Sequence, residues 1–305
     1  MKVLVTGVGG QLGYDVMNEL AARGILGVGT DILPENMVKT PEKNVEFLKM
    51  PYVVLDITDA KAAENVIATE KPDAVVHCAA WTAVDAAEEE QNQEKVRAIN
   101  VGGTANIAKA CKQYGCKMTY ISTDYVFDGQ GEQAWLPDCK DYKPLNVYGE
   151  SKLQGELAVS TTLDKYFIVR IAWVFGLNGN NFIKTMLRLS EKYDTLRVVN
   201  DQIGTPTYTY DLARLLVDML TTEKYGYYHA TNEGGFISWY DFACEIFKQA
   251  KRNVKVNPVS TAEYGVSKAV RPFNSRLDKS KLEENGFKKL PTWQDALQRY
   301  LKQIL

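Results

Sequence analysis

The chain has 305 residues, of which 45% are hydrophobic and 24% are charged, so it can bury one large core plus a small second lobe. Its 36 basic and 38 acidic side chains give a net charge of -2, which argues against a basic face of the size that binds nucleic acid or an anionic membrane. The expected partner is therefore a small molecule.

Cysteine usage and the first residues indicate the compartment. The five cysteines are odd in number and widely spread, which favours free thiols in a reducing cytosol over a disulfide framework. The sequence opens on a strand-like run, MKVLVTG, without an apolar leader, and no apolar run approaches the length of a membrane span. We expect a cytoplasmic protein that is neither secreted by a signal peptide nor membrane-spanning.

Up to about residue 175, short apolar runs alternate with helical patterns. The apolar runs predict strands at residues 2–6, 25–30, 52–55, 74–79, 118–122 and 167–172. Helical periodicity predicts helices at residues 11–23, 60–69, 90–114 and 148–160. Continuous apolar strands are buried on both faces, so the pattern predicts an α/β fold with a doubly wound, Rossmann-like parallel sheet.

Beyond about residue 176 the predicted elements become shorter. A loop rich in Gly and Asn at 176–181 leads into a helix that ends near Lys192, and a strand at 197–199 and a helix from Tyr210 follow. We expect residues 1–175 to form the sheet domain and residues 176–305 to form a smaller C-terminal lobe, with chain crossings between the two.

The loop after the first strand is rich in glycine. Residues 6–13 read TGVGGQLG, in which Gly7, Gly10 and Gly13 follow a G-x-x-G-x-x-G spacing. Glycines permit a tight turn and a close approach of the backbone to a pyrophosphate, and the next helix offers unpaired N–H groups. Asp31, eighteen residues beyond Gly13, ends the second strand, where a carboxylate can bind a ribose. This context predicts a nicotinamide dinucleotide site; a turn without a ligand is the alternative.

The charge of Asp31 bears on the choice between the two nicotinamide cofactors. The carboxylate would repel the extra phosphate of NADP and favours NAD or relaxed choice, although Lys39 could offset the repulsion. Asp56 and Ile57, after the third strand, could bracket the adenine. The complete predicted cofactor set, for NADPH or NADH, is Gly7, Gly10, Gln11, Leu12, Asp31, Asp56, Ile57, Ala79, Ala80, Thr82, Tyr148 and Lys152.

The most specific chemical signal is Y-x-x-x-K at Tyr148 and Lys152, at the start of a predicted helix. Residues four apart lie on one helix face, so the phenol and the ammonium can address the same small volume. A tyrosine with a pKa of about 10 is a poor acid-base group near neutrality, and we expect the lysine cation to lower that pKa. An exposed helix pair is the alternative when the spacing stands alone.

Other residues complete a candidate catalytic site and exclude competing ones. The fifth strand ends at Thr123, where its hydroxyl can donate to a carbonyl oxygen at the ligand-binding edge of the sheet. His77 lies inside an apolar strand and is interpreted as a core histidine, and His229 stands alone. The sequence contains neither a cluster typical of metal ligands nor an activated Ser or Cys arrangement, so no metal site is predicted.

Eight stretches carry a resemblance to a known family. They are TGVGGQLG at 6–13, HCAAWTAVDAAE at 77–88, NVGGTANIAKAC at 100–111, STDYVFDG at 122–129, PLNVYGESKLQGE at 144–156, RIAWVFG at 170–176, DQIGTPTYTYDLA at 201–213 and RPFNSRLDKSKL at 271–282. Over nearly its whole length the chain resembles the extended short-chain dehydrogenases, in the branch formed by the dTDP-4-dehydrorhamnose reductases. STDYVFDG and PLNVYGESKLQGE are rather specific to that branch.

The resemblance implies roles for particular residues. Thr123, Tyr148 and Lys152 fall on the catalytic triad of the family, and the implied substrate contacts are Asp124, Tyr125, Trp173, Asn274 and Arg276. The implied reaction is reduction of dTDP-4-dehydro-6-deoxy-L-mannose at C4 to dTDP-L-rhamnose, for surface polysaccharide. Residues 1–175 would bind the dinucleotide and residues 176–305 the substrate. Members of the family can pair as a homodimer through a divalent ion, and no residue here is assigned to one.

The sequence also departs from the family, and alternatives stay open. Trp81 stands where many relatives carry Tyr, Ile171 and Ala172 replace a more polar pair, and residues 32–51 form a longer stretch than usual. The alternative functions are a reductase or epimerase of another nucleotide sugar, and a non-catalytic NADP-binding regulatory subunit, as in the beta subunit of methionine adenosyltransferase.

Overall fold

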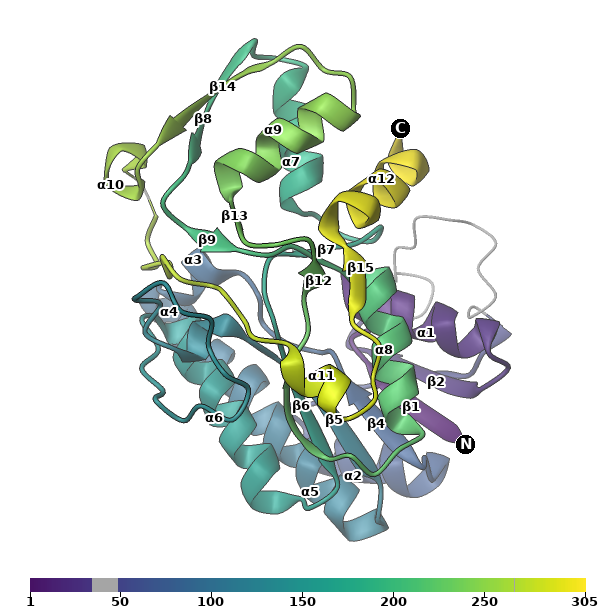
Figure 1. Ribbon diagram of the computed structural model, residues 1–305. Coiled ribbons are helices and arrows are strands. Elements are labelled where there is room, and N and C mark those ends of the chain that lie inside the picture. The colour runs from purple at the N-terminus through teal and green to yellow at the C-terminus, as the bar shows by residue number, and fades with distance from the viewer. Residues whose placement is uncertain (35–48, 266) are drawn as a thin grey trace.

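A computed structural model describes residues 1–34, 49–265 and 267–305, and its centre is a parallel sheet of seven strands (Figure 1). The strand order is β11-β6-β5-β4-β1-β2-β3. The strands are β1 (Lys2–Thr6), β2 (Leu26–Asp31), β3 (Tyr52–Val54), β4 (Ala74–His77), β5 (Lys117–Thr123), β6 (Tyr166–Ile171) and β11 (Gly226–His229). The predicted doubly wound parallel sheet is confirmed, and all six strands expected before residue 175 are present within a few residues of their predicted ends.

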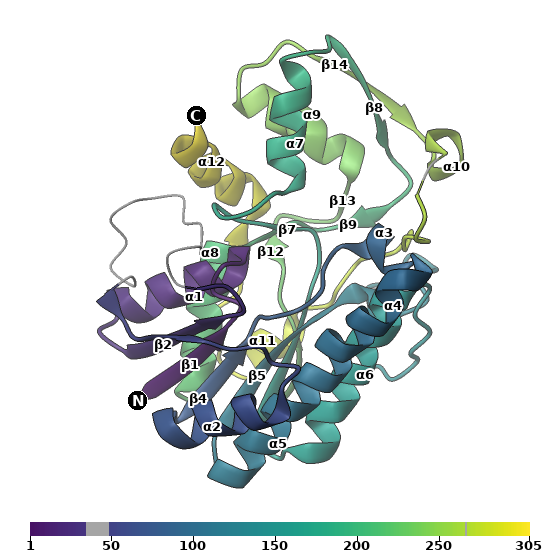
Figure 2. The same ribbon diagram turned by 180° about the vertical axis from the view of Figure 1, so that it is seen from behind.

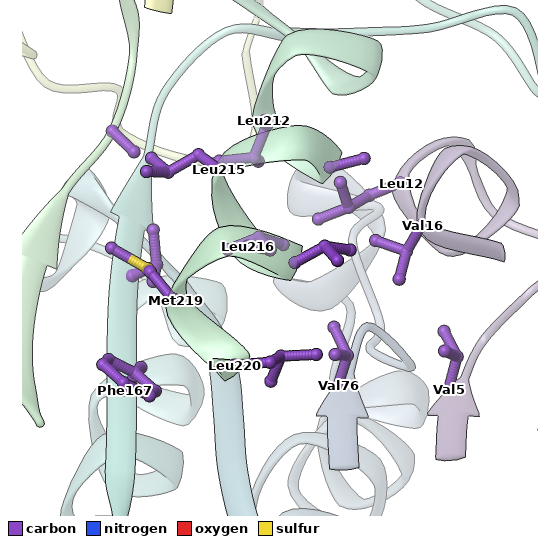
Figure 3. Close-up of a cluster of buried hydrophobic side chains, with 14 of the residues drawn as sticks. Val5, Leu12, Val16, Val76, Phe167, Leu212, Leu215, Leu216, Met219 and Leu220 are labelled. Carbon is purple, nitrogen blue, oxygen red and sulfur yellow. The ribbon is translucent and has the colours of Figure 1, made fainter. Parts of the chain in front are cut away.

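Helices cover both faces of the sheet because successive strand residues point to opposite sides. In β1, Val3 and Val5 enter one apolar cluster and Leu4 enters the other. The first cluster lies beneath α1 (Gln11–Ala22), α8 (Thr209–Leu220) and α11 (Ser280–Glu284), and Figure 3 shows the side chains of α1 and α8 meeting above the strands. The second lies beneath α2 (Ala60–Glu70), α5 (Thr104–Tyr114) and α6 (Val147–Thr162), which Figure 2 shows from behind.

The single helix predicted over residues 90–114 is wrong in detail. The structure has α4 (Glu90–Arg97), then a π-helical segment (Ala98–Gly103), then α5. A π-helical turn inserts an extra residue into the helix and often marks a functional site. Hydrophobic periodicity cannot distinguish such an insertion from a continuous α-helix, because it shifts the apolar stripe by only one residue.

A smaller lobe lies beyond the carboxyl edge of the sheet (Figure 1). Its helices α7 (Phe182–Ser190), α9 (Trp239–Gln249) and α12 (Trp293–Ile304) share a third apolar cluster. The strands β8 (Thr195–Val199) and β14 (Lys255–Val259) pair in parallel beside it. The short elements are α3 (Val84–Ala87), α10 (Thr261–Tyr264), β7 (Val174–Phe175), β9 (Ile203–Gly204), β10 (Thr207–Tyr208), β12 (Asn232–Glu233), β13 (Ile237–Ser238), β15 (Leu290–Thr292) and a 3-10 turn (Asp124–Val126).

The chain crosses between these two regions more than once. Helix α8 packs on α1, and β11 extends the main sheet beside β6, although both elements follow residue 176. That residues 1–175 bind the dinucleotide and residues 176–305 bind the substrate stays a prediction. In the structure, α8 and β11 belong to the layers of the sheet domain although they follow residue 176. No helix within the described residues is both long and apolar enough to cross a membrane.

Candidate active site

A cavity with a volume of about 540 Å³ opens at the carboxyl edge of the sheet. Every residue of the predicted cofactor set lines it, and so do the predicted triad and three of the five predicted substrate contacts. The members of the lining that matter below are Gly7, Gly13, Asp31, Thr123, Asp124, Tyr125, Tyr148, Lys152, Trp173 and Trp239. The sequence prediction therefore brings together residues that the fold places around one cavity.

The glycine-rich loop has backbone geometry that side chains would disrupt. Gly7 has a φ of +71°, and its N–H donates to the carbonyl oxygen of Thr30 at 2.8 Å. A Cβ on Gly7 would lie 2.7 Å from the backbone nitrogen of Ala79, and a Cβ on Gly13 would lie 2.3 Å from the carbonyl oxygen of Gly7. The glycines thus allow β1, β4 and α1 to converge tightly at the start of the helix.

Asp31 holds the glycine-rich loop as well as facing the cavity. Its Oδ2 accepts a hydrogen bond from the N–H of Gly9 at 2.9 Å, and its Oδ1 accepts one from the N–H of Ile32 at 2.8 Å. Each carboxylate oxygen has a second lone pair, so a ribose hydroxyl can still be bound. The predicted counter-charge, Lys39, lies outside the described residues.

A loop of the C-terminal lobe clamps the same glycine-rich loop, which sequence reasoning missed. The side-chain amide of Asn178 donates to the carbonyl oxygen of Gly9 at 2.7 Å. The amide of Asn181 donates to Oε1 of Gln11 at 3.1 Å. Both contacts join residues about 170 positions apart, and only the Asn-rich composition of the loop hinted at them.

The predicted triad comes from two neighbouring elements. Thr123 is the last residue of β5, whereas Tyr148 lies in the first turn of α6 and Lys152 one turn later. Asn146 caps α6 by accepting a hydrogen bond from the N–H of Gly149 at 2.7 Å, which fixes where the helix begins. Thr123 and Tyr148 line the same cavity, close enough for the Thr123 hydroxyl to influence the pKa of the phenol.

Lys152 is anchored from beneath. Its Nζ donates to the carbonyl oxygen of Ile121 at 2.7 Å and lies 4.1 Å from the centre of the Tyr120 ring. The hydroxyl of Tyr120 in turn donates to the carbonyl oxygen of Lys152 at 3.2 Å. A cation over an aromatic face in a buried site is stabilised by the ring quadrupole. Tyr120 therefore supports the lysine, although the sequence alone gave it no role.

Burial shifts the pKa values of the pair in opposite directions. Removal from water raises the pKa of Tyr148, with the neighbouring Asp124 adding to the effect, and it lowers the pKa of Lys152 to about 7. The prediction that Lys152 lowers the pKa of Tyr148 is wrong for this structure, because desolvation of the phenol dominates. The consequence is a phenol that stays protonated near neutrality and can act as a proton donor.

Asp124 lies beside this pair and has an oxygen that is free to accept a further hydrogen bond. It is buried, its Oδ1 accepts a hydrogen bond from Thr123 at 3.0 Å, and its Oδ2 has no partner within the described residues. Burial raises the pKa of its carboxyl to about 6. Tyr125 packs edge-on against Tyr148, with ring centres 5.6 Å apart. A polar ligand in the cavity would find both side chains within the lining.

Two tryptophans form another part of the lining. Trp173 follows β6, and its ring stacks on that of Trp239, the first residue of α9. Trp173 matches its predicted place near the site, whereas sequence reasoning missed Trp239. An isolated Trp at the start of a helix in the lobe gave no signal that it would reach the cavity.

The structure does not bring Asn274 and Arg276 into the cavity lining. Asn274 is buried, and its side-chain amide donates to the carbonyl oxygens of Gln130 and Gln133 at 3.1 and 2.8 Å. Its Oδ1 accepts from Nη1 of Arg276 at 2.9 Å. Asn274 thus ties loops together in this structure, and a nucleotide contact by either residue stays a prediction.

Neither histidine forms a competing site. His77 is buried between the hydroxyls of Thr6 and Thr104 at 2.8 and 3.1 Å, and burial lowers its pKa to about 3, so its interpretation as a core histidine is confirmed. His229 does not stand alone, because its Nε2 lies 3.4 Å from Nη1 of the buried Arg170. No group of three His, Cys, Asp or Glu within the described residues is arranged to hold a metal ion.

A Rossmann-like sheet, a glycine-rich turn and a Thr, Tyr and Lys set around one cavity define the class of the short-chain dehydrogenases. The family model described as the RmlD substrate binding domain matches residues 1–305, and the chain belongs to this family. Among curated proteins, it is 38% identical to a dTDP-4-dehydrorhamnose reductase of Aggregatibacter actinomycetemcomitans, over 97% of both chains. It is 36% identical to the spore coat polysaccharide biosynthesis protein SpsK of Bacillus subtilis, over 99% of this chain and 97% of that protein.

Solved structures agree with the sequence relatives. A dTDP-4-dehydrorhamnose reductase from Clostridium acetobutylicum superposes with a TM-score of 0.88 at 37% identity, covering 100% of this chain and 99% of that one. The same enzyme from Bacillus anthracis, in complex with NADP, gives a TM-score of 0.87 at 37% identity, with 99% of each chain covered. Similarity of this extent covers the lobe as well as the sheet.

Proposed function

We propose that this protein is an oxidoreductase that uses NADPH or NADH to reduce the C4 keto group of dTDP-4-dehydro-6-deoxy-L-mannose, giving dTDP-L-rhamnose for surface polysaccharide. The observation that carries the proposal is the convergence of Thr123, Tyr148 and Lys152 on the cavity that the glycine-rich loop also lines, with Lys152 one helical turn after Tyr148. The relatives at 35–41% identity named dTDP-4-dehydrorhamnose reductase support the choice of substrate.

The residues present fit a nicotinamide dinucleotide. The absence of Cβ atoms at Gly7 and Gly13 keeps the backbone of the loop close to the start of α1, which leaves N–H groups for a pyrophosphate. Asp31 stands at the end of β2, where the adenosine ribose would lie. Once bound, the reduced cofactor supplies a hydride to the carbonyl carbon.

The chain's own residues would then handle the carbonyl oxygen. Tyr148, protonated because burial raises its pKa, gives its phenolic proton to the oxygen as negative charge develops there. Thr123 donates a hydrogen bond to the same oxygen, where the bond strengthens toward the transition state. Lys152, held by Ile121 and Tyr120, is placed to add positive charge near the phenol and to hold a ribose hydroxyl.

The deciding experiment follows the loss of NADPH or NADH absorbance on addition of enzymatically generated dTDP-4-dehydro-6-deoxy-L-mannose. Tyr148→Phe should lower turnover by roughly 10²- to 10⁴-fold, since it removes the proton donor, while NADPH affinity stays nearly unchanged. Tyr166→Phe is the matched control, because Tyr166 opens β6 outside the cavity lining. Unchanged turnover in Tyr148→Phe would reject the catalytic assignment.

The same assay separates the alternatives. Rapid oxidation with another 4-keto nucleotide sugar, and none with the proposed substrate, would place the chain with a different sugar. Absence of oxidation together with a stoichiometric protein partner in a pull-down would favour the non-catalytic subunit.

We place the reaction in the cytoplasm, since all five cysteines are free thiols. A homodimer, and a divalent ion at its interface, stay predictions that sedimentation with and without a chelator would test.

A further inference from the structure

The rings of Trp173 and Trp239 form a face-to-face stack within the cavity lining. Their centres are 3.7 Å apart and their planes differ by 16°. The two residues come from different regions of the chain, since Trp173 follows β6 of the sheet and Trp239 begins α9 of the lobe. The stack is therefore a place where the lobe directly sets the shape of the cavity.

Trp173 is held in a backbone conformation that costs free energy. Its φ of +51° lies in the left-handed region, which a residue other than glycine adopts only at an energetic cost. Such strain persists only where surrounding contacts determine the conformation, and it is concentrated at functional sites. Gly204 makes room for the ring, because a Cβ there would lie 3.0 Å from Cε2 of Trp173.

Trp239 is held in place by a helix cap, a strand pairing and a ring contact within the lobe. Ser238 caps α9 in a reciprocal capping box with Asp241, which accepts from the N–H of Ser238 at 2.9 Å and donates its own N–H to Oγ at 3.0 Å. Strand β13 pairs with β9, so the start of α9 is tied to the segment that carries Gly204. The ring of Phe182 packs against Trp239 at 4.6 Å between centres.

The stack lies close to the expected reaction centre. Thr123 pairs with Ile171 in the register of β5 and β6, and Trp173 follows only two residues later. A flat aromatic surface beside the carbonyl site suits the apolar C–H face of a hexose ring better than it suits a charged diphosphate.

We propose that Trp239 is a positioning residue for sugar recognition, which fixes the ring of Trp173 as the wall against which the hexose packs. This inference rests on the proposed function for the identity of the sugar ligand. It assigns to α9 of the lobe a share in sugar selectivity that is separate from proton transfer by Tyr148. Trp239 acts through Trp173 and takes no part in the chemical step.

The test measures binding of dTDP-L-rhamnose and of dTDP, separately, to the full-length chain by calorimetry. Trp239→Ala should weaken the binding of dTDP-L-rhamnose by roughly three- to tenfold and the binding of dTDP by less than about twofold, because only dTDP-L-rhamnose carries the sugar. Trp239→Phe should recover most of the loss. In the reductase assay Trp239→Ala should raise KM for the sugar nucleotide more than it lowers kcat.

The control is Trp293→Phe, which changes another indole of the same apolar cluster outside the cavity lining. It should leave both affinities unchanged. Circular dichroism adds a readout of the stack itself: two coupled indoles give an exciton couplet, which Trp239→Ala should abolish and Trp293→Phe should retain. In the wild type, dTDP-L-rhamnose should alter the couplet and dTDP should not.

The outcomes separate the inference from the proposed function. Equal losses of affinity for dTDP and dTDP-L-rhamnose in Trp239→Ala, or no loss for either ligand, would overturn the role of Trp239. The proposed reductase function would be unaffected by that result. A wild-type chain that binds both ligands but oxidises neither NADPH nor NADH would overturn the proposed reaction, and the binding comparison would still decide on Trp239.

Discussion

The proposed cofactor side and the proposed sugar side of the cavity are built in different ways. The proposed cofactor side comes from residues at the ends of the neighbouring strands β1, β2 and β4, including the glycine-rich loop that leads from β1 into α1. The proposed sugar side has Trp173 and Trp239 in its lining, with Gly204 beside the Trp173 ring, and three separate segments bring these residues together. A site made of local motifs can be recognised in a sequence, whereas a site made of distant single residues requires the fold.

The largest expected effect tests the cofactor side alone. Gly13→Ala would place a Cβ 2.3 Å from the carbonyl oxygen of Gly7, which is backbone and cannot rotate away. The shift of the loop should weaken NADPH binding by roughly ten- to a hundredfold, measured by NADPH fluorescence titration. Gly102→Ala is the control, because a Cβ there meets nothing within 4 Å. Equal affinities in both variants would remove the loop from the cofactor site.

A second change tests how firmly the chain beyond residue 176 is joined to the sheet. Asp15 of α1 contacts Thr209 of α8, and burial raises the pKa of its carboxyl to about 7. The single hydroxyl proton of Thr209 cannot serve both Asp15 and the carbonyl oxygen of Phe175. A protonated Asp15 donates to Thr209 and satisfies both acceptors.

The sign of the pH effect follows from that raised pKa. The folded chain binds the proton more tightly than the unfolded chain does, so this contribution to stability is present below about pH 4 and is lost as the pH rises through 7. Asp15→Asn, which resembles the protonated form, should raise the free energy of unfolding by about 1–3 kcal/mol at pH 8. Denaturant titrations of both chains from pH 5 to 8 would measure this difference in the free energy of unfolding. A difference that does not vary with pH would contradict the raised pKa of Asp15.

Much of the fold could be predicted because parallel strands buried on both faces give continuous apolar runs. The runs at β1, β4 and β5 are of this kind, and their ends located the glycine-rich loop, His77 and Thr123. The spacing of Tyr148 and Lys152 on one helix was equally local. The relative placement of these motifs then followed from the rule that ligands bind at the carboxyl edge of such a sheet.

What the sequence did not predict depends on contacts between distant residues or on burial. Trp239 and Asn178 reach the cavity region only because the lobe folds back over the sheet edge. The direction of the Tyr148 pKa shift was wrong, because the extent of desolvation cannot be known before the packing is. The segment with Lys39 lies outside the described residues, so the choice between NADH and NADPH stays a prediction.

That choice can be tested on the cofactor side. Asp31→Asn keeps an oxygen that can accept from the N–H of Gly9 but removes the negative charge. The ratio of kcat/KM for NADPH to that for NADH should rise about fivefold or more, because repulsion of the extra phosphate is relieved. Asp56→Asn, which changes another carboxylate of the lining, should move the ratio less. An unchanged ratio in Asp31→Asn would show that the phosphate lies elsewhere.

The smallest expected effect concerns one hydrogen bond that joins the loop after β7 to the glycine-rich loop. Asn178 belongs to the loop that leads into the lobe, yet its amide binds the carbonyl oxygen of Gly9 at 2.7 Å. Loss of one partly buried hydrogen bond in Asn178→Ala should raise KM for the cofactor about two- to fivefold and leave KM for the sugar nucleotide unchanged. Asn285→Ala, which removes a similar bond to the carbonyl oxygen of Lys281, should change neither constant. If KM for the sugar nucleotide rises instead, the loop after β7 contributes to sugar binding and not to cofactor binding. The sugar site would then extend to the neighbourhood of the glycine-rich loop.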